Sequence, residues 1–438
     1  MQSVMRTLLC AGAAVAVSLL TACGSGSGTT TPANIRIVND TAFTATLYLN
    51  GSASSPATAT HSSSTYAAVT PSTYTLNVAS SNGSAGPAST VGLGTAQNYT
   101  ALAYQRGSVV YSAVYADNQS APSAGYASLD VANVSQDAGP LDVYVVSPPS
   151  TDLTGLSPTF ASVQGLSTAS TFAAAPTTYA IIVTGSGNPT DVRLTLLDQK
   201  FVSSQPYTLA LTSTTGGALV DAALVPQGIN VPASSFIASN QSRVRLLSAL
   251  PTAAPGTEVT ASVGTSSSGA VALQPDYAPS PTPYQLVPAG SSIQTLTVVG
   301  GGAVTLPAGV TFSAGGDYTI LVYGTVSAPL VSVLADSNLI IANRASVRMI
   351  NAAVTGNAGV TLFVNGSLTS SGVLYGTDVS SGTSVSYTGV TPAASATIQP
   401  IGGGYTGGNA PAQGLNSGSV YTVFVYDATL PPLVITDR

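Results

Sequence analysis

The single histidine of the chain, His61, is the first residue whose type allows acid–base chemistry, and it lies in the segment ATATHSSSTY. An imidazole beside a serine hydroxyl is the pair that activates serine hydrolases, so Ser62 and Ser64 are the candidate nucleophiles. The segment does not resemble the strained, glycine-flanked turn that exposes such a serine, and no other repeat described below contains a histidine. The sequence therefore favours a solvated loop histidine and predicts no catalytic residue.

Aspartates are the other groups that can do chemistry. A glycosidase needs two carboxyl groups that face each other across a sugar, and Ca²⁺ needs several oxygen ligands from one compact loop. The acids are scattered instead, with Asp137 and Asp142 among the nearest pairs. Asp117, Asp336 and Asp437 recur just after a predicted closing strand, which favours turn or inter-module hydrogen bonds. We predict no metal site, and a structural Ca²⁺ at the joints between modules stays an open alternative.

The overall composition excludes several other classes. Lys and Arg number 10 and Asp and Glu 16, so charged residues make up 6% of the chain where about a quarter is usual. The net charge of −6 argues against a nucleic-acid partner, which needs a basic face to neutralise phosphates. Lys200 is interpreted as a surface charge. No lysine follows the glycine triplets at 300–302 and 402–404, so they indicate turns between strands, and no cofactor is predicted.

The first 22 residues have the composition of an export signal. Arg6 supplies the positive charge, and the apolar run Leu8 to Leu20 has the length of a signal core. Thirteen such residues are too few to span a bilayer as a helix. We therefore expect residues 1–22 to be a lipoprotein signal peptide, for the reason given next.

The segment Leu20-Thr21-Ala22-Cys23 closes this region and resembles the lipobox of bacterial lipoproteins. The resemblance implies that the Cys23 thiol carries a diacylglyceryl group and anchors an exported chain to the membranes of the cell envelope. Gly24 stands where inner-membrane retention signals usually carry Asp, which favours the outer membrane, on its periplasmic face or at the cell surface. Residues 23–33 would be the lipidated Cys and a flexible tether. An ordinary cleaved signal with an incidental Cys is the alternative.

An internal repeat organises the rest of the chain. A Tyr-Thr pair followed by an apolar run occurs four times, a little over a hundred residues apart, with Tyr at 99, 207, 318 and 421. Each copy opens on a related strand: IRIVN at 35–39, LDVAN at 129–133, VRLLS at 244–248 and VRMIN at 347–351. An aromatic residue leads toward a proline halfway through each copy, at Tyr66, Phe172, Tyr284 and Tyr387. Landmarks in a constant order predict four tandem modules.

The apolar runs have the character of β-strands. They last five to eight residues, are rich in Val, Ile, Leu, Thr and Tyr, and end at Gly, Asn, Ser or Pro. Asn50-Gly51 and Asn365-Gly366 supply the positive φ angles of tight hairpins. We predict an all-β chain of four small antiparallel, immunoglobulin-like β-sandwiches, arranged as a semi-rigid string. The expected modules span residues 34–119, 126–228, 242–337 and 346–438.

This order of strands, Asn-Gly turn, aromatic-to-proline segment and Tyr-Thr strand resembles the bacterial secreted domain of unknown function 4397. The resemblance covers nearly all of the chain after the tether and is clearest in the first and fourth modules. The second module departs from it, since Asp130 replaces the arginine of the opening strand. The third departs at the segment TEVTASVG and in a proline-rich insertion at 275–283. Because the family has no established activity, no functional residue is carried over from it.

The repeated tyrosines are expected to fill one core position four times, whereas Tyr104, Tyr111 and Tyr115 are candidates for surface contact with a ligand. Taken together, the sequence predicts a non-enzymatic envelope lipoprotein that presents four β-sandwich modules in a structural or adhesive role. The alternative is a carbohydrate-binding or carbohydrate-acting envelope protein. A glycan or protein ligand is not identified by the sequence, and the membrane is the partner expected through the N-terminal lipid.

Overall fold

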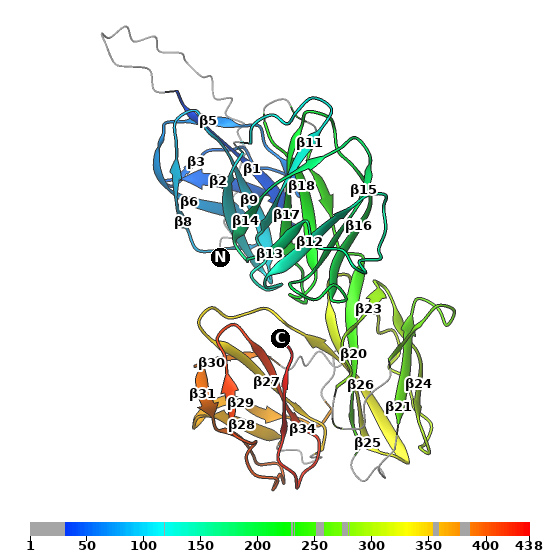
Figure 1. Cartoon of the computed structure of the whole chain (residues 1–438). Coiled ribbons are helices and arrows are strands. Elements are labelled where there is room, and N and C mark those ends of the chain that lie inside the picture. Colours follow the sequence, from blue (N-terminus) through cyan, green and yellow to red (C-terminus); the bar gives the residue numbers. More distant parts are fainter. Residues whose placement is uncertain are drawn as a thin grey trace, which may run out of the picture.

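The chain is built of β-strands, 35 of them within the residues described, where no helix occurs (Figure 1). The computed structural model describes residues 31–438 except 118, 229–230, 232, 251–257, 274–278, 280, 354–358 and 377–385. This part of the chain offers no helix that could cross a lipid bilayer. The all-β prediction is confirmed. The predicted signal peptide, Cys23 and most of the tether lie outside the described residues.

The first unit, residues 33–116, is a sandwich of two sheets. One sheet has the order β4-β1-β9-β10-β7, with β5 also paired to β1, and the other has the order β3-β2-β6-β8. Their bounds are β1 Ala33–Asp40, β4 Ser62–Ser63, β5 Ala67–Val69, β7 Ser84–Ala85, β9 Asn98–Arg106 and β10 Val109–Ala116, then β2 Ala45–Leu49, β3 Ser52–Ala53, β6 Ser72–Ser80 and β8 Ser89–Leu93. Asn50 and Gly51 turn β2 into β3 with φ angles of 49° and 79°, as their sequence predicts.

The second unit, residues 127–237, repeats the arrangement with the sheets β14-β11-β17-β18-β19 and β13-β12-β15-β16. The bounds are β11 Ala127–Asn133, β14 Ser167–Ala174, β17 Pro206–Ser213, β18 Val220–Pro226 and β19 Ser235–Ile237, then β12 Leu141–Val146, β13 Phe160–Val163, β15 Thr178–Gly185 and β16 Val192–Lys200. The last strand, β19, lies beyond residue 228, where the second module was expected to end, and it pairs with β18. This strand therefore widens the sheet of the second unit.

The third unit, residues 241–336, and the fourth, residues 345–436, have smaller outer sheets. In the third, β23-β20-β25-β26 faces β22-β21-β24; in the fourth, β30-β27-β34-β35 faces β29-β28-β32, beside the pair β31-β33. The third unit has β20 Gln241–Ala249, β21 Val259–Gly264, β22 Val271–Leu273, β23 Gln285–Pro288, β24 Ser292–Val298, β25 Asp317–Thr325 and β26 Ala328–Asp336. The fourth has β27 Ala345–Asn351, β28 Val360–Val364, β29 Ser367–Val373, β30 Thr388–Val390, β31 Ala393–Ala396, β32 Ile398–Ile401, β33 Gln413–Leu415, β34 Val420–Val425 and β35 Leu433–Thr436.

The four sheets that hold the opening strands are mixed, which differs from the purely antiparallel sheets expected, whereas the strands of the facing sheets pair antiparallel. The opening strand of each unit runs parallel to the Tyr-Thr strand, in the pairs β1–β9, β11–β17, β20–β25 and β27–β34. The reason lies in the connection between them. The chain crosses to the opposite sheet and returns between these two strands, so no hairpin turn forces them to run in opposite directions.

The repeated tyrosine occupies the same place in each unit, as predicted. Tyr99, Tyr207 and Tyr421 are buried in the cores of their units, and Tyr318 packs against the core of the third. Each phenol oxygen accepts a hydrogen bond from the backbone N–H five residues earlier, at Gly94, Val202, Ser313 and Asn416. A tyrosine bonded back to an upstream backbone group is a recognised feature of immunoglobulin-like sandwiches. The Tyr-Thr repeat is thus a structural signature.

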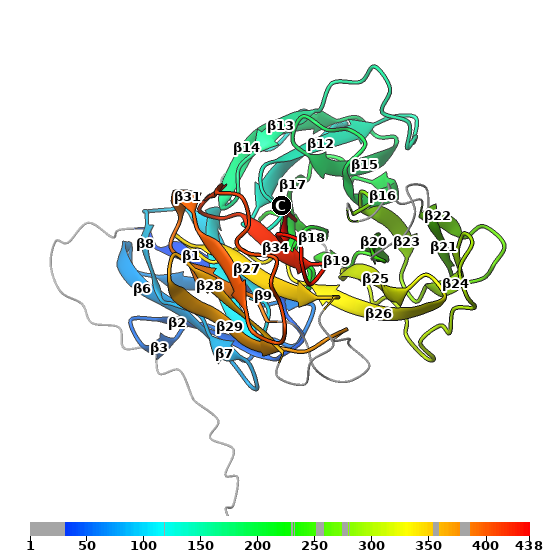
Figure 2. The same ribbon diagram turned by 90° about the horizontal axis from the view of Figure 1, so that it is seen from below.

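The units do not form a string. The first and second pack face to face through the sheets that hold the opening strands, and the third and fourth pack in the same way (Figures 1 and 2). Tyr104 and Tyr115 are buried in the first of these interfaces, and Tyr111 packs against them. These tyrosines therefore join two units, instead of forming the exposed contact surface that the sequence suggests. Phe424 and Tyr323 are buried in the second interface.

Candidate functional site

The four landmarks of the repeat meet in one buried cluster, seen most completely in the third unit. The Arg245 Nε–H on β20 donates to Thr319 Oγ1 on β25 at 2.9 Å. Thr319 Oγ1 and the Tyr284 hydroxyl each donate to Asp336 Oδ2 at 2.6 Å. The Arg245 guanidinium also lies 4.6 Å from the centre of the Tyr284 ring. Residues that are far apart in the sequence thus form a single hydrogen-bonded group of Arg, Tyr, Thr and Asp.

Two such clusters are cross-linked across the interface between the third and fourth units. Arg348 of the fourth unit reaches Asp336 of the third at 2.5 Å, and Arg245 of the third reaches Asp437 of the fourth at 2.6 Å. The Arg348 Nε–H also donates to Thr422 Oγ1 of its own unit at 2.8 Å. This exchange of equivalent contacts is the pattern of an isologous, twofold interface, here formed by two repeats of one chain.

The electrostatics of this interface favour charged groups in spite of burial. Burial alone would raise the pKa of Asp336, but the Arg348 and Arg245 guanidinium groups hold that pKa below its ordinary value. Burial would likewise lower the pKa of Arg348, and the Asp336 carboxylate raises it instead. Asp336 and Arg348 are therefore an ion pair at neutral pH, with both side chains fully buried.

The interface between the first and second units uses a variant of the cluster. Arg36 donates to Thr100 Oγ1 at 2.9 Å and lies 3.5 Å from Asp117 of its own unit. Its Nη2–H donates across the interface to the Pro226 carbonyl at 2.6 Å. At the place of the recurring aspartate the second unit has Gln227, whose Nε2–H donates to Thr208 Oγ1 at 2.8 Å. A backbone carbonyl thus takes the part that a carboxylate plays between the third and fourth units.

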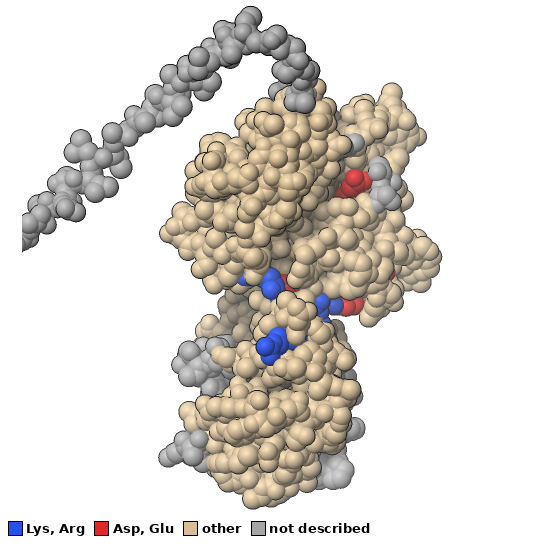
Figure 3. Space-filling model, turned by 90° about the vertical axis from the view of Figure 1, so that its left-hand side faces the viewer, with Lys and Arg blue, Asp and Glu red and all other residues tan. Residues whose placement is uncertain are grey.

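Charged residues also gather where the two pairs of units meet, at the narrow waist of the molecule (Figure 3). Arg106 of the first unit donates both a Nε–H and a Nη2–H to Asp137 of the second, at 2.7 and 2.6 Å. The same carboxylate accepts the Ile340 N–H at 2.8 Å. The C-terminal Arg438 donates to the carbonyls of Asn338 and Gln136. These contacts join the segment between the third and fourth units to the first two.

The waist also has close backbone contacts. The Gly216 N–H donates to the Gly315 carbonyl, and the Asn338 N–H donates to the Gly216 carbonyl, both at 2.8 Å. A Cβ atom at Gly217, which has a φ of 88°, would lie 2.8 Å from the backbone of Asn338. Glycine is required here both by the backbone angle and by the space.

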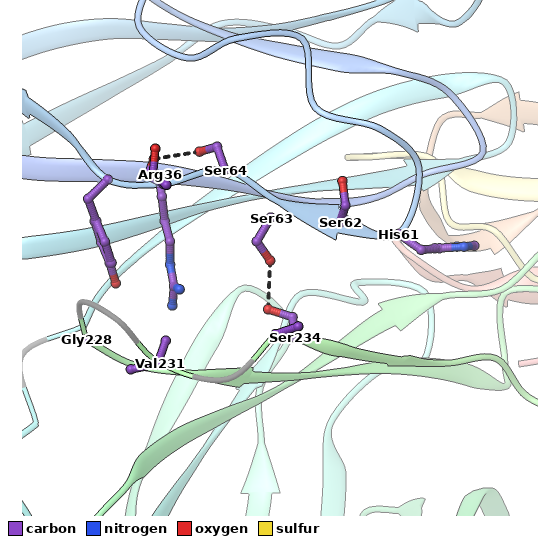
Figure 4. Close-up of a pocket in the computed structure, with 11 residues that line it drawn as sticks. Arg36, His61, Ser62, Ser63, Ser64, Gly228, Val231 and Ser234 are labelled. Carbon is purple, nitrogen blue, oxygen red and sulfur yellow. Dashed lines mark hydrogen bonds between the residues drawn. The ribbon is translucent and has the colours of Figure 1, made fainter.

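His61, which was considered above for acid–base chemistry, lies in a pocket of about 430 Å³ between the first unit and Gly228, Val231, Ala233 and Ser234 of the second. Its ring points away from Ser62, Ser63 and Ser64, while Ser63 faces Ser234 across the pocket (Figure 4). The hydroxyls of Ser62 and Ser64 donate to backbone carbonyls of their own loop. The acid near the imidazole is Asp40, 3.8 Å from Nε2. This is the geometry of a loop stabilised by its own hydroxyl groups.

The other residues singled out in the sequence have structural surroundings. Asp137 is the partner of Arg106, and Asp142 accepts the N–H groups of Ser162 and Gly187 at 2.6 and 2.8 Å. Lys200 is exposed at the end of β16. Within the described residues, no three His, Cys, Asp or Glu side chains come together in a way that would hold a metal ion. The lipidation residue Cys23 lies outside the described part.

Sequence reasoning recognised the recurring Arg, aromatic, Thr and Asp landmarks but did not assign them to one cluster. The signal was present, because all four recur in the same order in the first, third and fourth modules, while the second module has Asp130 and Gln227 in place of the arginine and the aspartate. A change of the charged residue in the opening strand together with the residue after the closing strand indicates a physical contact between them.

Comparison with known proteins agrees with part of this organisation. The profile of the family described as Domain of unknown function (DUF4397) matches residues 33–144, from the first residue of β1 into β12. No curated protein matches the chain. The chain therefore contains a DUF4397 domain at residues 33–144.

Proposed function

We propose that this protein is a non-enzymatic cell-envelope lipoprotein that holds four β-sandwich units as one stiff body at a membrane surface. The observation that carries the proposal is the use made of its charged residues. Arg36, Arg106, Arg245, Arg348 and Arg438 all bond across joints between units. A chain with so few charges that places them at internal joints is suited to keeping a fixed shape.

The outer surface supports a passive structural or adhesive role. In Figure 3 the face in view carries few charged side chains away from the waist. Four related units held in fixed positions present several similar surfaces at once. Weak contacts made by such surfaces add up to strong attachment when they engage a partner together. The stiffness that the joints provide favours this, because little conformational freedom is lost on binding.

Replacing Cys23 with Ala is expected to move the protein from the membrane fraction to the soluble fraction. The acyl chains supply the anchoring free energy, about 0.8 kcal/mol for each buried CH₂ group. Cys10→Ala, a change of the same type inside the signal peptide, should leave the protein membrane-bound. Cell fractionation followed by immunoblotting measures both. A Cys23→Ala protein that stays with the membrane would exclude the lipid anchor. Separately, protease treatment of intact cells expressing the wild-type protein shows whether the units lie inside or outside the outer membrane.

A glycan-binding role is the second candidate, and the pocket beside Ser63 is the observation that favours it. Its walls carry several serine and threonine hydroxyls together with Tyr66 and His61, and its volume suits one or two sugar rings. A glycan array is expected to detect binding that Ser63→Ala and Ser234→Ala weaken together, while the exposed control Ser267→Ala leaves it unchanged. A parallel hydrolase screen distinguishes binding from turnover. If the pocket variants keep the glycan binding and the turnover of the wild type, this pocket is excluded as the glycan site.

A further inference from the structure

Two partly buried aspartates at the joint between the first and second units, Asp40 and Asp221, differ from the other joint acids. Asp117, Asp137, Asp336 and Asp437 each lie beside an arginine. Asp40 and Asp221 do not: within the part of the chain that the structure describes, neither forms an ion pair with Arg or Lys. Two carboxyl groups that share a buried joint without a nearby cation repel each other when both are ionised.

Asp40 ends β1 of the first unit and points into the second. Its side chain is 9% exposed, and Oδ2 accepts a hydrogen bond from the Thr212 hydroxyl on β17 at 2.8 Å. The Thr212 hydroxyl belongs to the opposite unit, so this bond exists only while the joint is closed. The charge of Asp40 is thus coupled to the contact between the two units.

Asp221 on β18 faces the same joint from the second unit. Its Oδ1 accepts the Ser239 N–H at 2.6 Å. The other titratable groups there are His61, whose Nε2 lies 3.8 Å from Asp40, and Tyr115 on β10. The His61 side chain is 59% exposed and packs on the Phe236 ring at 5.5 Å between centres, so water screens any charge it carries. Burial raises the pKa of Tyr115 well above its ordinary value, so this phenol stays neutral.

We propose that the joint between the first and second units is proton-sensitive: it is most firmly closed when the Asp40–Asp221 pair holds a proton, and it loosens when both carboxyl groups ionise. Closure removes both groups from water, and no buried cation compensates them. Opening returns them to water and breaks the Thr212–Asp40 bond. The pocket beside Ser63 lies between the same two units, so its shape would follow the state of this joint.

The direction of the pH dependence follows from the pKa values of the two acids. Burial, then the nearby Asp221 carboxylate, raises the pKa of Asp40 to about 7 against the opposing Thr212 bond. Burial raises the pKa of Asp221 to about 6. An acid whose pKa is raised by closure favours the closed state at low pH, and this preference is lost as the pH rises from about 4 toward those values. The joint should therefore be tightest in mildly acid solution.

The interface between the third and fourth units supplies an internal control of opposite sign. The pKa of Asp336 is held below its ordinary value by Arg348 and Arg245, so this interface weakens only as the pH falls below about 4. Between pH 5 and 8 its stability should be nearly constant. The same molecule therefore contains one interface that responds to pH in this range and one that does not.

Hydrogen–deuterium exchange of the complete protein between pH 5 and 8 tests the proposal without any substitution. The exchange rates are first corrected for the effect of pH on the intrinsic rate of amide exchange. The opening equilibrium constant in β1 and β17 is then expected to rise about tenfold per pH unit for each proton released, until the pH reaches the pKa of the acid. Exchange in β27 and β34 should not change in this way. Equal behaviour of the two interfaces would overturn the proposal.

Isosteric variants identify the groups responsible. Asp40→Asn and Asp221→Asn should each flatten the pH dependence in β1 and β17, and both should protect the joint better than the wild type does at pH 8. As a control, Asp152→Asn removes an exposed charge of the second unit and should leave the pH dependence of the joint intact. Retention of the full dependence by both joint variants would overturn the proposal. The proposal would also be overturned if excess Ca²⁺ abolished the pH dependence of the wild type and a chelator restored it, because the two acids would then hold a cation instead of a proton.

Discussion

Replacing Arg348 with Met is expected to weaken the interface between the third and fourth units by about 3–5 kcal/mol. Arg348 is completely buried, and its partner Asp336 would be left inside the protein with Arg245 at 3.8 Å as its nearest cation. A buried charge that loses its closest partner keeps the cost of leaving water but loses most of the compensating attraction. Native-state hydrogen exchange in β27 and β25 measures the change in opening free energy.

Two further variants separate this effect from a general loss of an arginine. Arg344→Met removes an exposed arginine near the same strand and should change the opening free energy by no more than about 0.5 kcal/mol. Adding Asp336→Asn to Arg348→Met should recover part of the loss, because no unpaired carboxylate then remains. Two results would contradict a stabilising role of the Arg348–Asp336 ion pair. One is an Arg348→Met protein as stable as the wild type, and the other is a double variant no more stable than Arg348→Met alone.

Replacing Asn39 with Ala is expected to destabilise the first unit by about 3 kcal/mol or more. The Asn39 side chain is fully buried, and its Nδ2 donates to the carbonyls of Phe43, Thr58 and Ala59 at 2.8, 3.0 and 2.9 Å. Its Oδ1 accepts the Thr41 hydroxyl at 2.8 Å. Each buried polar group left without a partner costs about 1–3 kcal/mol. Native-state exchange in β1 and β2 measures the loss.

The matched control is Asn77→Ala on the outer face of β6, where the asparagine is half-buried. This change should alter stability by less than about 1 kcal/mol. Asn133 is bonded in the second unit much as Asn39 is in the first, to the carbonyls of Gly139 and Val163. An Asn39→Ala protein that loses no more than the control would show that water replaces the missing donor.

The sequence alone was sufficient for features that depend on local patterning. Short apolar runs rich in β-branched residues and tyrosine specify strands, and Asn-Gly pairs specify hairpins through the backbone angles of two residues. The order of repeated landmarks predicted successive β-sandwich units and the shared position of Tyr99, Tyr207, Tyr318 and Tyr421. Each of these follows from residues that act within one strand, one turn or one repeated unit. For Asp117, Asp336 and Asp437 it left turn and inter-module hydrogen bonds as alternatives, and the contacts of Asp336 and Asp437 between units appear only in the tertiary structure.

Only the tertiary structure decided which faces meet. Arg245 and Asp437 are 192 residues apart, and Asp40 and Thr212 are 172 apart, so no local pattern brings them together. The parallel strand pairs, the face-to-face packing and the burial of Tyr104 and Tyr115 depend on how whole sheets dock. Docking is determined by the shape and charge of surfaces assembled from many strands. A buried carboxyl group also changes its preferred charge state only once another unit has excluded water from it.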